Sequence, residues 1–171
     1  MIHRPCEACG LSRFRRQIVR GRGCIPCDIL FIGEAPGKSE DLRGEAFVGP
    51  AGKVLGYLIE DAGLADASYY ILNCCACRPC DSRSSPNREP TASEVLACMP
   101  RVHEEILRAD PDKIILLGQV AARFYGKEYP TALYLVHPSF LLRSGGRASP
   151  MYSPTLRALI EYTTKKEEVS E

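Results

Sequence analysis

Long hydrophobic runs are missing from this chain of 171 residues. A helix that spans a membrane needs about 18 consecutive apolar residues, so an integral membrane protein is excluded. The opening residues, Met-Ile-His-Arg-Pro-Cys, lack the apolar centre of a signal peptide, and we expect a protein that is not secreted. Hydrophobic residues make up 45% and charged residues 25%, which excludes collagen-like, coiled-coil and disordered chains. The length predicts one domain over residues 1–171.

Net charge is also small, at +1, but the arginines are unevenly distributed. Residues 1–23 hold six arginines and one acid, and residues 137–160 hold three arginines and no acid. Clustered arginine in a nearly neutral chain indicates a surface that meets an anion such as a phosphate backbone. A solvated surface that keeps the protein soluble explains the same pattern.

Cysteine is unusually frequent. The nine cysteines are Cys6, Cys9, Cys24, Cys27, Cys74, Cys75, Cys77, Cys80 and Cys98. An odd number without an export signal argues against a disulfide framework. It favours metal ligands or redox chemistry in a reducing compartment.

Alternating strand and helix patterns predict the fold. Runs that are apolar on both faces predict buried parallel strands at residues 28–32, 69–73, 113–117 and 133–136. Helical spacing predicts helices at residues 54–62, 91–106, 119–125 and 154–162. This order predicts an α/β fold with three layers, α/β/α, around a central four-stranded parallel sheet.

Local signals refine the second predicted helix and set the N-terminal segment apart. Thr91 and Glu94 form a capping-box pattern at the start of the second helix, and Pro100 should kink that helix or split off its first turn. Residues 1–27 show no periodicity and form a basic, cysteine-bearing segment that needs something to hold it in place.

Polar and glycine-rich residues follow the predicted strands. They are the turn Gly33–Gly37, Asn73, Gly118 and the pair His137-Pro138. Ligands of open parallel sheets bind beyond the carboxyl ends of the strands, so we expect a site at this edge. Gly49–Lys53 has part of the phosphate-loop pattern. Phe47 stands where the first glycine should be and Val54 replaces the Ser/Thr, so a nucleoside-triphosphate site is excluded.

Over residues 6–143 the chain carries an ordered set of motifs, each weak alone and specific together. They are Cys6-x2-Cys9, Gly33–Gly37 continued by Glu40-Asp41, Gly44–Gly52, Asn73-x3-Cys77-Arg-Pro79, Asn87-Arg88, Cys98-x-Pro100 and His137-Pro-Ser-x-Leu-Leu-Arg143. By this set the sequence resembles the uracil-DNA glycosylase superfamily, most closely the iron–sulfur type called family 4, with its phage-type relatives.

The resemblance implies a monofunctional DNA glycosylase that hydrolyses the N-glycosidic bond of uracil in single- or double-stranded DNA, in base excision repair. The base leaves as an anion, so such an enzyme must stabilise charge on the uracil O2 and position a water below C1′. By their matched positions, His137 would donate a hydrogen bond to O2, Asn73 would bind the pyrimidine edge, and Phe47 would stack on the extruded base. Ala35 is expected to contact the substrate. Considered alone, Asn73 is typical of a turn residue that ends a strand, and Phe47 is equally typical of a core.

Further residues match the acids and the DNA-binding loop of the family. Glu34, Glu40 and Asn87 are candidates for positioning water and for excluding the thymine methyl group, and Glu34 ranks above Glu40. Leu142 and Arg143 match the loop that fills the gap left by a flipped base and holds the backbone. No lysine occupies a matched site position, so we expect no Schiff-base lyase step.

Four of the cysteines match ligands of a [4Fe–4S] cluster in the family: Cys6, Cys9, Cys77 and Cys98. Such a cluster would tie residues 1–27 to the domain. Zinc is the alternative, because a site of four thiolates suits both metals. The pairs Cys24-x2-Cys27 and Cys77-x2-Cys80 supply further candidate ligands, for which spare thiols are the favoured interpretation. The loop between Cys77 and Cys98 carries extra residues, Cys80–Ser85.

One departure from the family concerns base specificity. Only Gly126–Ala132 separates the helix predicted at 119–125 from the last strand, where family 4 usually has a β-hairpin with an Arg-Gly pair. A different modified pyrimidine is therefore an alternative substrate. A non-catalytic DNA-binding relative is another alternative, although it would need only the arginines. We expect a monomer that acts on DNA in the cytoplasm, associated with the nucleoid and without contact with a membrane.

Overall fold

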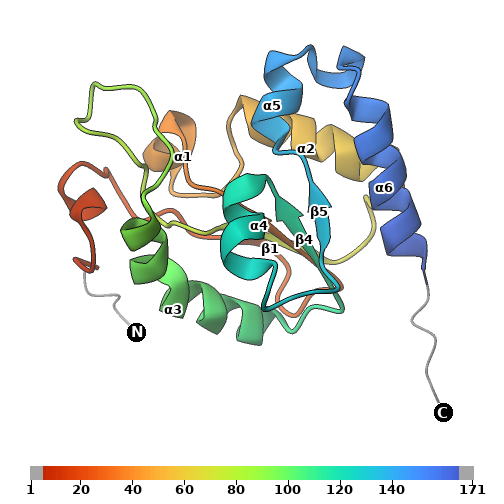
Figure 1. The fold of residues 1–171 in the computed structure, drawn as a ribbon, viewed down its shortest axis with the longest axis horizontal. Coiled ribbons are helices and arrows are strands. Elements are labelled where there is room, and N and C mark those ends of the chain that lie inside the picture. The colour runs from red at the N-terminus through yellow and green to blue at the C-terminus, as the bar shows by residue number, and fades with distance from the viewer. Residues whose placement is uncertain (1–5, 166–171) are drawn as a thin grey trace.

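Five β-strands form one sheet in the computed structural model, which describes residues 6–165 (Figure 1). The strands are β1 (Arg22–Gly23), β2 (Ile29–Gly33), β3 (Tyr69–Asn73), β4 (Lys113–Leu117) and β5 (Leu133–Leu135), in the order β1-β3-β2-β4-β5. Strands β2 to β5 are parallel to their neighbours, whereas β1 runs antiparallel to β3. All four predicted parallel strands are present.

The prediction of a four-stranded sheet is wrong by one strand. β1 is two residues long and lies in the basic N-terminal segment, so it has no apolar pattern by which a sequence could show it. Backbone hydrogen bonds hold this segment: the Val19 N–H donates to the Ala76 carbonyl at 2.7 Å, and the Arg20 N–H donates to the Gly44 carbonyl at 2.9 Å. The tie that a metal cluster would add to residues 1–27 stays a prediction, and residues 1–5 lie outside the described part.

Helices cover both faces of the sheet (Figure 1). They are α1 (Lys38–Arg43), α2 (Pro50–Asp61), α3 (Ala92–Ala109), α4 (Gln119–Tyr125), α5 (Pro138–Arg143) and α6 (Tyr152–Thr164), with short 3-10 helices η1 (Gly10–Arg13) and η2 (Gly146–Ala148). Alternate residues of the strands face opposite layers, as a pleated sheet requires. Phe31 belongs to the core shared with α2, α5 and α6, and Leu30 to the core shared with α3 and α4. The predicted three-layer α/β/α fold is confirmed.

Helix α3 confirms the capping box and excludes one of the two effects expected of Pro100, a first turn that is split off. The Thr91 hydroxyl oxygen accepts from the Glu94 N–H at 3.3 Å, and the Glu94 carboxylate accepts from the Thr91 N–H at 2.8 Å. The helix runs unbroken from Ala92 to Ala109 through Pro100, so no first turn is split off.

Two further observations concern the connection before β5 and the length of the helices. Between α4 and β5, residues 126–132 form consecutive turns without a strand, so the hairpin is absent there, as expected. Within the described range, none of the helices has the length and apolar character needed to cross a membrane.

Candidate functional site

A cleft of about 530 Å³ opens beyond the carboxyl ends of β2 and β3. All of the predicted catalytic and substrate-binding residues line it: Glu34, Ala35, Glu40, Phe47, Asn73, Asn87, His137, Leu142 and Arg143. They come from the turn after β2, from α1, from the loop before α2, from the end of β3, from the loop before α3 and from α5. The fold therefore brings segments that lie far apart in the chain to one place.

His137 lines this cleft and carries an unpartnered hydrogen-bond donor. The backbone N–H of Ser139 donates to Nδ1 of His137 at 3.1 Å. A backbone amide can only donate, so Nδ1 is the acceptor and the proton of the neutral ring is on Nε2. Nε2 is buried and has no hydrogen-bond partner within residues 6–165. Burial, with a smaller effect of Arg143, lowers the pKa of His137 to about 4, so the ring is neutral at pH 7.

Asn73 and Phe47 complete the pocket around this donor. Asn73 ends β3, and its Oδ1 is also buried and unpartnered in the described part of the chain. The ring centroids of Phe47 and His137 lie 5.9 Å apart. A Cβ atom at Gly33 would lie 2.4 Å from Phe47 Cζ and 2.7 Å from Asn73 Oδ1, so only glycine leaves room for both side chains. The pocket thus combines an aromatic wall with one unused donor and one unused acceptor.

Arg22 supports Phe47, a role that sequence analysis missed. Phe47 has a positive backbone φ of 54°, which residues other than glycine rarely adopt. Arg22 Nε donates to the Ala46 carbonyl at 2.8 Å, and Arg22 Nη2 donates to the Phe47 carbonyl at 3.3 Å. This support depends on the pairing of β1 with β3, for which the sequence carries no signal.

The two glutamates of the site differ in their surroundings. Both oxygens of Glu40 are occupied, because Oε1 accepts from the Gly49 N–H at 2.7 Å and Oε2 from the Gly37 N–H at 3.1 Å. The Glu34 carboxylate accepts no hydrogen bond from any described residue. Burial raises the pKa of Glu34, Glu89 adds to this shift, and Arg143 opposes it. Glu40 therefore holds two loops together, whereas Glu34 is available as a base.

At the rim of the cleft, α5 presents Leu142 and Arg143. Leu142 is 40% exposed, and Arg143 has no ion pair in the described range. Arg147, another of the three arginines in residues 137–160, is engaged elsewhere. Its Nε donates to Asp61 Oδ2 at 3.0 Å, and its guanidinium lies 4.3 Å from the centre of the Tyr57 ring. Arg147 thus fastens η2 to α2.

A second, smaller cavity of about 70 Å³ is lined by the four cysteines that match cluster ligands, Cys6, Cys9, Cys77 and Cys98. The other five cysteines do not line it. Arg15 Nη1 donates to Cys77 Sγ at 3.5 Å, and the Ala76 N–H donates to Cys98 Sγ at 3.3 Å. Among residues 6–165, however, no three His, Cys, Asp or Glu side chains are arranged closely enough to hold a metal ion.

The donor chemistry of this cavity fits a metal bound by thiolates. A hydrogen bond from Cys75 lowers the pKa of Cys98, which favours the thiolate. Burial raises the pKa of Cys9 and of Cys77, so both are protonated thiols at pH 7. They would release their protons on binding a metal, because a metal binds the thiolate. Hydrogen bonds to sulfur, as Arg15 makes to Cys77, are a typical feature of iron–sulfur sites.

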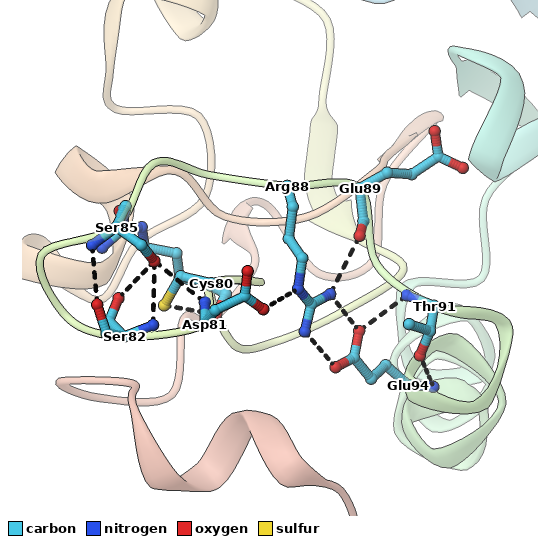
Figure 2. Close-up of polar contacts among 9 residues, drawn as sticks. Cys80, Asp81, Ser82, Ser85, Arg88, Glu89, Thr91 and Glu94 are labelled. Carbon is cyan, nitrogen blue, oxygen red and sulfur yellow. Dashed lines mark hydrogen bonds and ion pairs between the residues drawn. The ribbon is translucent and has the colours of Figure 1, made fainter.

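The loop that contains the extra residues Cys80–Ser85 contributes Pro79 and residues 87–89 to the lining of the cleft. Figure 2 shows the polar contacts within this loop. Ser85 Oγ accepts from the backbone N–H groups of Asp81 at 3.1 Å and Ser82 at 3.0 Å. Arg88 joins the loop to α3, because its Nε lies 3.0 Å from Asp81 Oδ1 and its Nη2 lies 2.8 Å from Glu94 Oε1. The loop is therefore internally bonded and anchored.

The part of the chain that forms this cleft is similar to known proteins. The family described as "Uracil DNA glycosylase superfamily" matches residues 20–160, which include every residue that lines the cleft. A type-4 uracil-DNA glycosylase of Saccharolobus solfataricus is 34% identical over 95% of this chain and 80% of its own. Enzymes of the same name from Archaeoglobus fulgidus and Thermotoga maritima are 33% and 34% identical, over 94% and 82% of this chain and 85% and 80% of their own.

Proposed function

Because the chain belongs to the uracil-DNA glycosylase superfamily, we propose that it hydrolyses the N-glycosidic bond of uracil in DNA. One observation carries this proposal: Asn73 Oδ1 and His137 Nε2 are both buried and unpartnered in the described structure, and both residues line the cleft with Phe47. Uracil carries an N3–H donor next to its O2 acceptor. These two groups complement the acceptor of Asn73 and the donor of His137.

His137 stabilises the departing base. Negative charge develops on the uracil O2 as the C1′–N1 bond breaks, and the Nε2–H group donates a hydrogen bond to that oxygen. Because the pKa of His137 is about 4, the ring acts as a neutral donor and does not transfer a proton. A fixed donor in a buried site stabilises such charge strongly, since it needs no reorganisation during the reaction.

Extrusion of the nucleotide places the base against Phe47. Enzymes that act on a base inside a duplex must flip it out of the stack and bind it in a pocket. Leu142, at the exposed rim, fills the space that the base leaves, and Arg143 binds the neighbouring phosphates. In single-stranded DNA the same pocket binds a base that is already unpaired.

Glu34 activates the attacking water. Its carboxylate lines the cleft and accepts no hydrogen bond from the described residues, so it is free to take a proton. Asn87 lines the same cleft and binds the water from another side. Glu40 acts indirectly, because its oxygens fix the backbone of the two loops at Gly37 and Gly49.

Cys6, Cys9, Cys77 and Cys98 would hold a [4Fe–4S] cluster, with zinc as the second candidate. Their shared cavity and the N–H groups directed at Cys77 and Cys98 support this assignment. When bound, the metal group would cross-link the N-terminal segment, the segment after β3 and α3.

A different modified pyrimidine remains the second candidate substrate. It is favoured by the short connection of turns over residues 126–132, where family 4 usually has a hairpin beside the site. The contacts of Asn73 and His137 fit a pyrimidine that keeps the N3–H and O2 groups, so the distinction from thymine depends on exclusion of its methyl group.

Release of uracil from single- and double-stranded oligonucleotides, followed by alkaline cleavage at the abasic site, tests the proposal. The wild-type protein should cleave the uracil strand and leave a matched thymine strand intact. His137→Ala should lower the rate by about 100- to 1,000-fold, the usual loss for one oxyanion donor. His103→Ala is the control, since His103 pairs with Glu128 and does not line the cleft. Full activity of His137→Ala would show that this pocket is not the site.

A further inference from the structure

Asn87 offers only one end of its side-chain amide to the cleft. Arg78 Nε donates to Asn87 Oδ1 at 2.6 Å. A guanidinium has donors and no acceptor, so its partner must be the amide oxygen, and the orientation of the amide follows from chemistry. The NH2 group of Asn87 then lies beside Gly37, where a Cβ would be 3.2 Å from Asn87 Nδ2 and 3.0 Å from Glu40 Oε2.

Arg78 is itself held in place. It is 4% exposed, and its guanidinium also donates from Nη1 to the Arg83 carbonyl at 3.2 Å and from Nη2 to the Ser85 carbonyl. Both carbonyls belong to the loop that carries the extra residues. Figure 2 shows how that loop is closed by Ser82 and Ser85 and joined through Arg88 to α3. A rotation of Arg78 away from Asn87 would break several hydrogen bonds at once.

This arrangement determines what Asn87 can do for a water molecule. In the hydrolysis, the water oxygen forms a bond to C1′, the C1′–N1 bond breaks with its electron pair leaving on uracil, and one water proton must go to a base. An amide oxygen facing the water would compete for that proton. Because the oxygen is turned toward Arg78, the NH2 group of Asn87 faces the water and donates to one of its lone pairs, and the proton is directed to Glu34.

We propose that Arg78 is a positioning residue, which fixes Asn87 as a donor to the attacking water and thereby leaves Glu34 to accept the water proton. The inference rests on the proposed function and extends it to a residue that does not line the cleft.

Asn87→Asp separates this role from a structural one. The carboxylate keeps an acceptor for Arg78 and adds an opposite charge, so the thermal midpoint at pH 7 should stay the same or rise. An oxygen replaces the donor that faces the water, so kcat should fall about 100-fold while KM changes less than about threefold. Asn87→Ala, in contrast, should lower both kcat and the thermal midpoint.

A double-mutant cycle tests Arg78 directly. Arg78→Lys should lower kcat about tenfold in the wild-type background, because lysine lacks the planar set of donors that fixes the amide. In the Asn87→Asp background it should have little further effect on kcat, because no amide orientation remains to be fixed. Arg83→Lys is the matched control on the same loop, since Arg83 is exposed and contributes its backbone carbonyl to Arg78.

Two outcomes would overturn the inference: wild-type kcat in Asn87→Asp, or an equal loss from Arg78→Lys in both backgrounds. If the wild-type protein releases no pyrimidine from DNA, the proposed function fails, and the thermal midpoints decide whether Arg78 orients Asn87. A lower midpoint for Asn87→Asp at pH 7 would then contradict the orientation, and an equal or higher one would support it.

Discussion

At the scale of single residues, Asn73 and His137 each carry a buried polar atom without a hydrogen-bond partner in the described structure. Leaving such an atom unpaired costs about 1–3 kcal/mol, so a folded protein usually avoids it. A ligand that supplies both missing partners recovers this free energy on binding. The two atoms therefore indicate which chemical groups the pocket selects.

The dependence of the rate on pH should follow Glu34. A carboxylate takes a proton only when ionised, so kcat/KM should fall as the pH drops through the pKa of Glu34, which burial raises above its ordinary value of 4.5. His137, with its pKa lowered to about 4, stays neutral over this range and does not produce the change. Glu89→Gln removes a negative neighbour of Glu34 and should move the fall to lower pH.

Arg143→Gln removes a positive neighbour of Glu34 and should move the same fall to higher pH. Glu60→Gln, on α2 and outside the cleft, is the control and should leave the profile unchanged. An identical profile in wild type, Glu89→Gln and Arg143→Gln would show that Glu34 is not the base.

At the scale of helices and strands, the sequence predicts the elements that bury a continuous apolar pattern. Strands β2, β3 and β4 and helices α2 and α3 belong to this group. The apolar residues of β5 also predict a strand, although its Tyr134 is exposed. β1, with two residues, and α1 and α5, with six each, are too short to show a period. The elements that the sequence does not predict matter for the site, since β1 carries Arg22 and α5 carries Leu142 and Arg143.

Helix α5 and the 3-10 helix η2 should differ in their effect on DNA binding. Arg143→Ala should reduce the slope of log affinity against log salt by about one, since one phosphate contact is lost. Arg147→Ala should leave the slope unchanged and lower the thermal midpoint, because Arg147 binds Asp61 on α2. Affinity for uracil-free DNA at several salt concentrations measures both, and a reduced slope for Arg147→Ala would return that residue to the DNA-binding surface.

At the scale of the whole molecule, the order of the motifs along the chain was sufficient to select residues that meet in one cleft. Their catalytic roles stay predictions. What the sequence could not supply is how the side chains are oriented. Ser139 fixes the tautomer of His137, Arg22 supports the backbone at Phe47, and Arg78 orients Asn87. The first two contacts involve backbone atoms, and the third joins two side chains within one irregular loop. A sequence carries no periodic signal for any of them.

The cavity lined by Cys6, Cys9, Cys77 and Cys98 predicts a visible property of the purified protein. With an iron–sulfur cluster the protein should be brown and absorb near ~400 nm, and the colour should bleach on oxidation. Cys98→Ala should lose the colour and much of the solubility, whereas Cys80→Ala should keep both, because Cys80 does not line the cavity. A colourless protein with one zinc ion per chain would contradict the cluster and leave the proposed reaction intact.

Release of uracil and of cytosine by Asn73→Asp tests most directly whether this pocket selects uracil. The Asn73 amide matches uracil with its carbonyl at N3–H and its NH2 at O4. Aspartate places an oxygen where the NH2 was, so it opposes the uracil O4 and accepts from the cytosine amino group. An opposed polar contact in a buried pocket costs about 1–3 kcal/mol, a factor of about ten to one hundred in rate. Asn73→Asp should therefore lose uracil release and gain weak cytosine release, most visible at a mismatch. Undiminished uracil release by Asn73→Asp would show that Asn73 does not select the base.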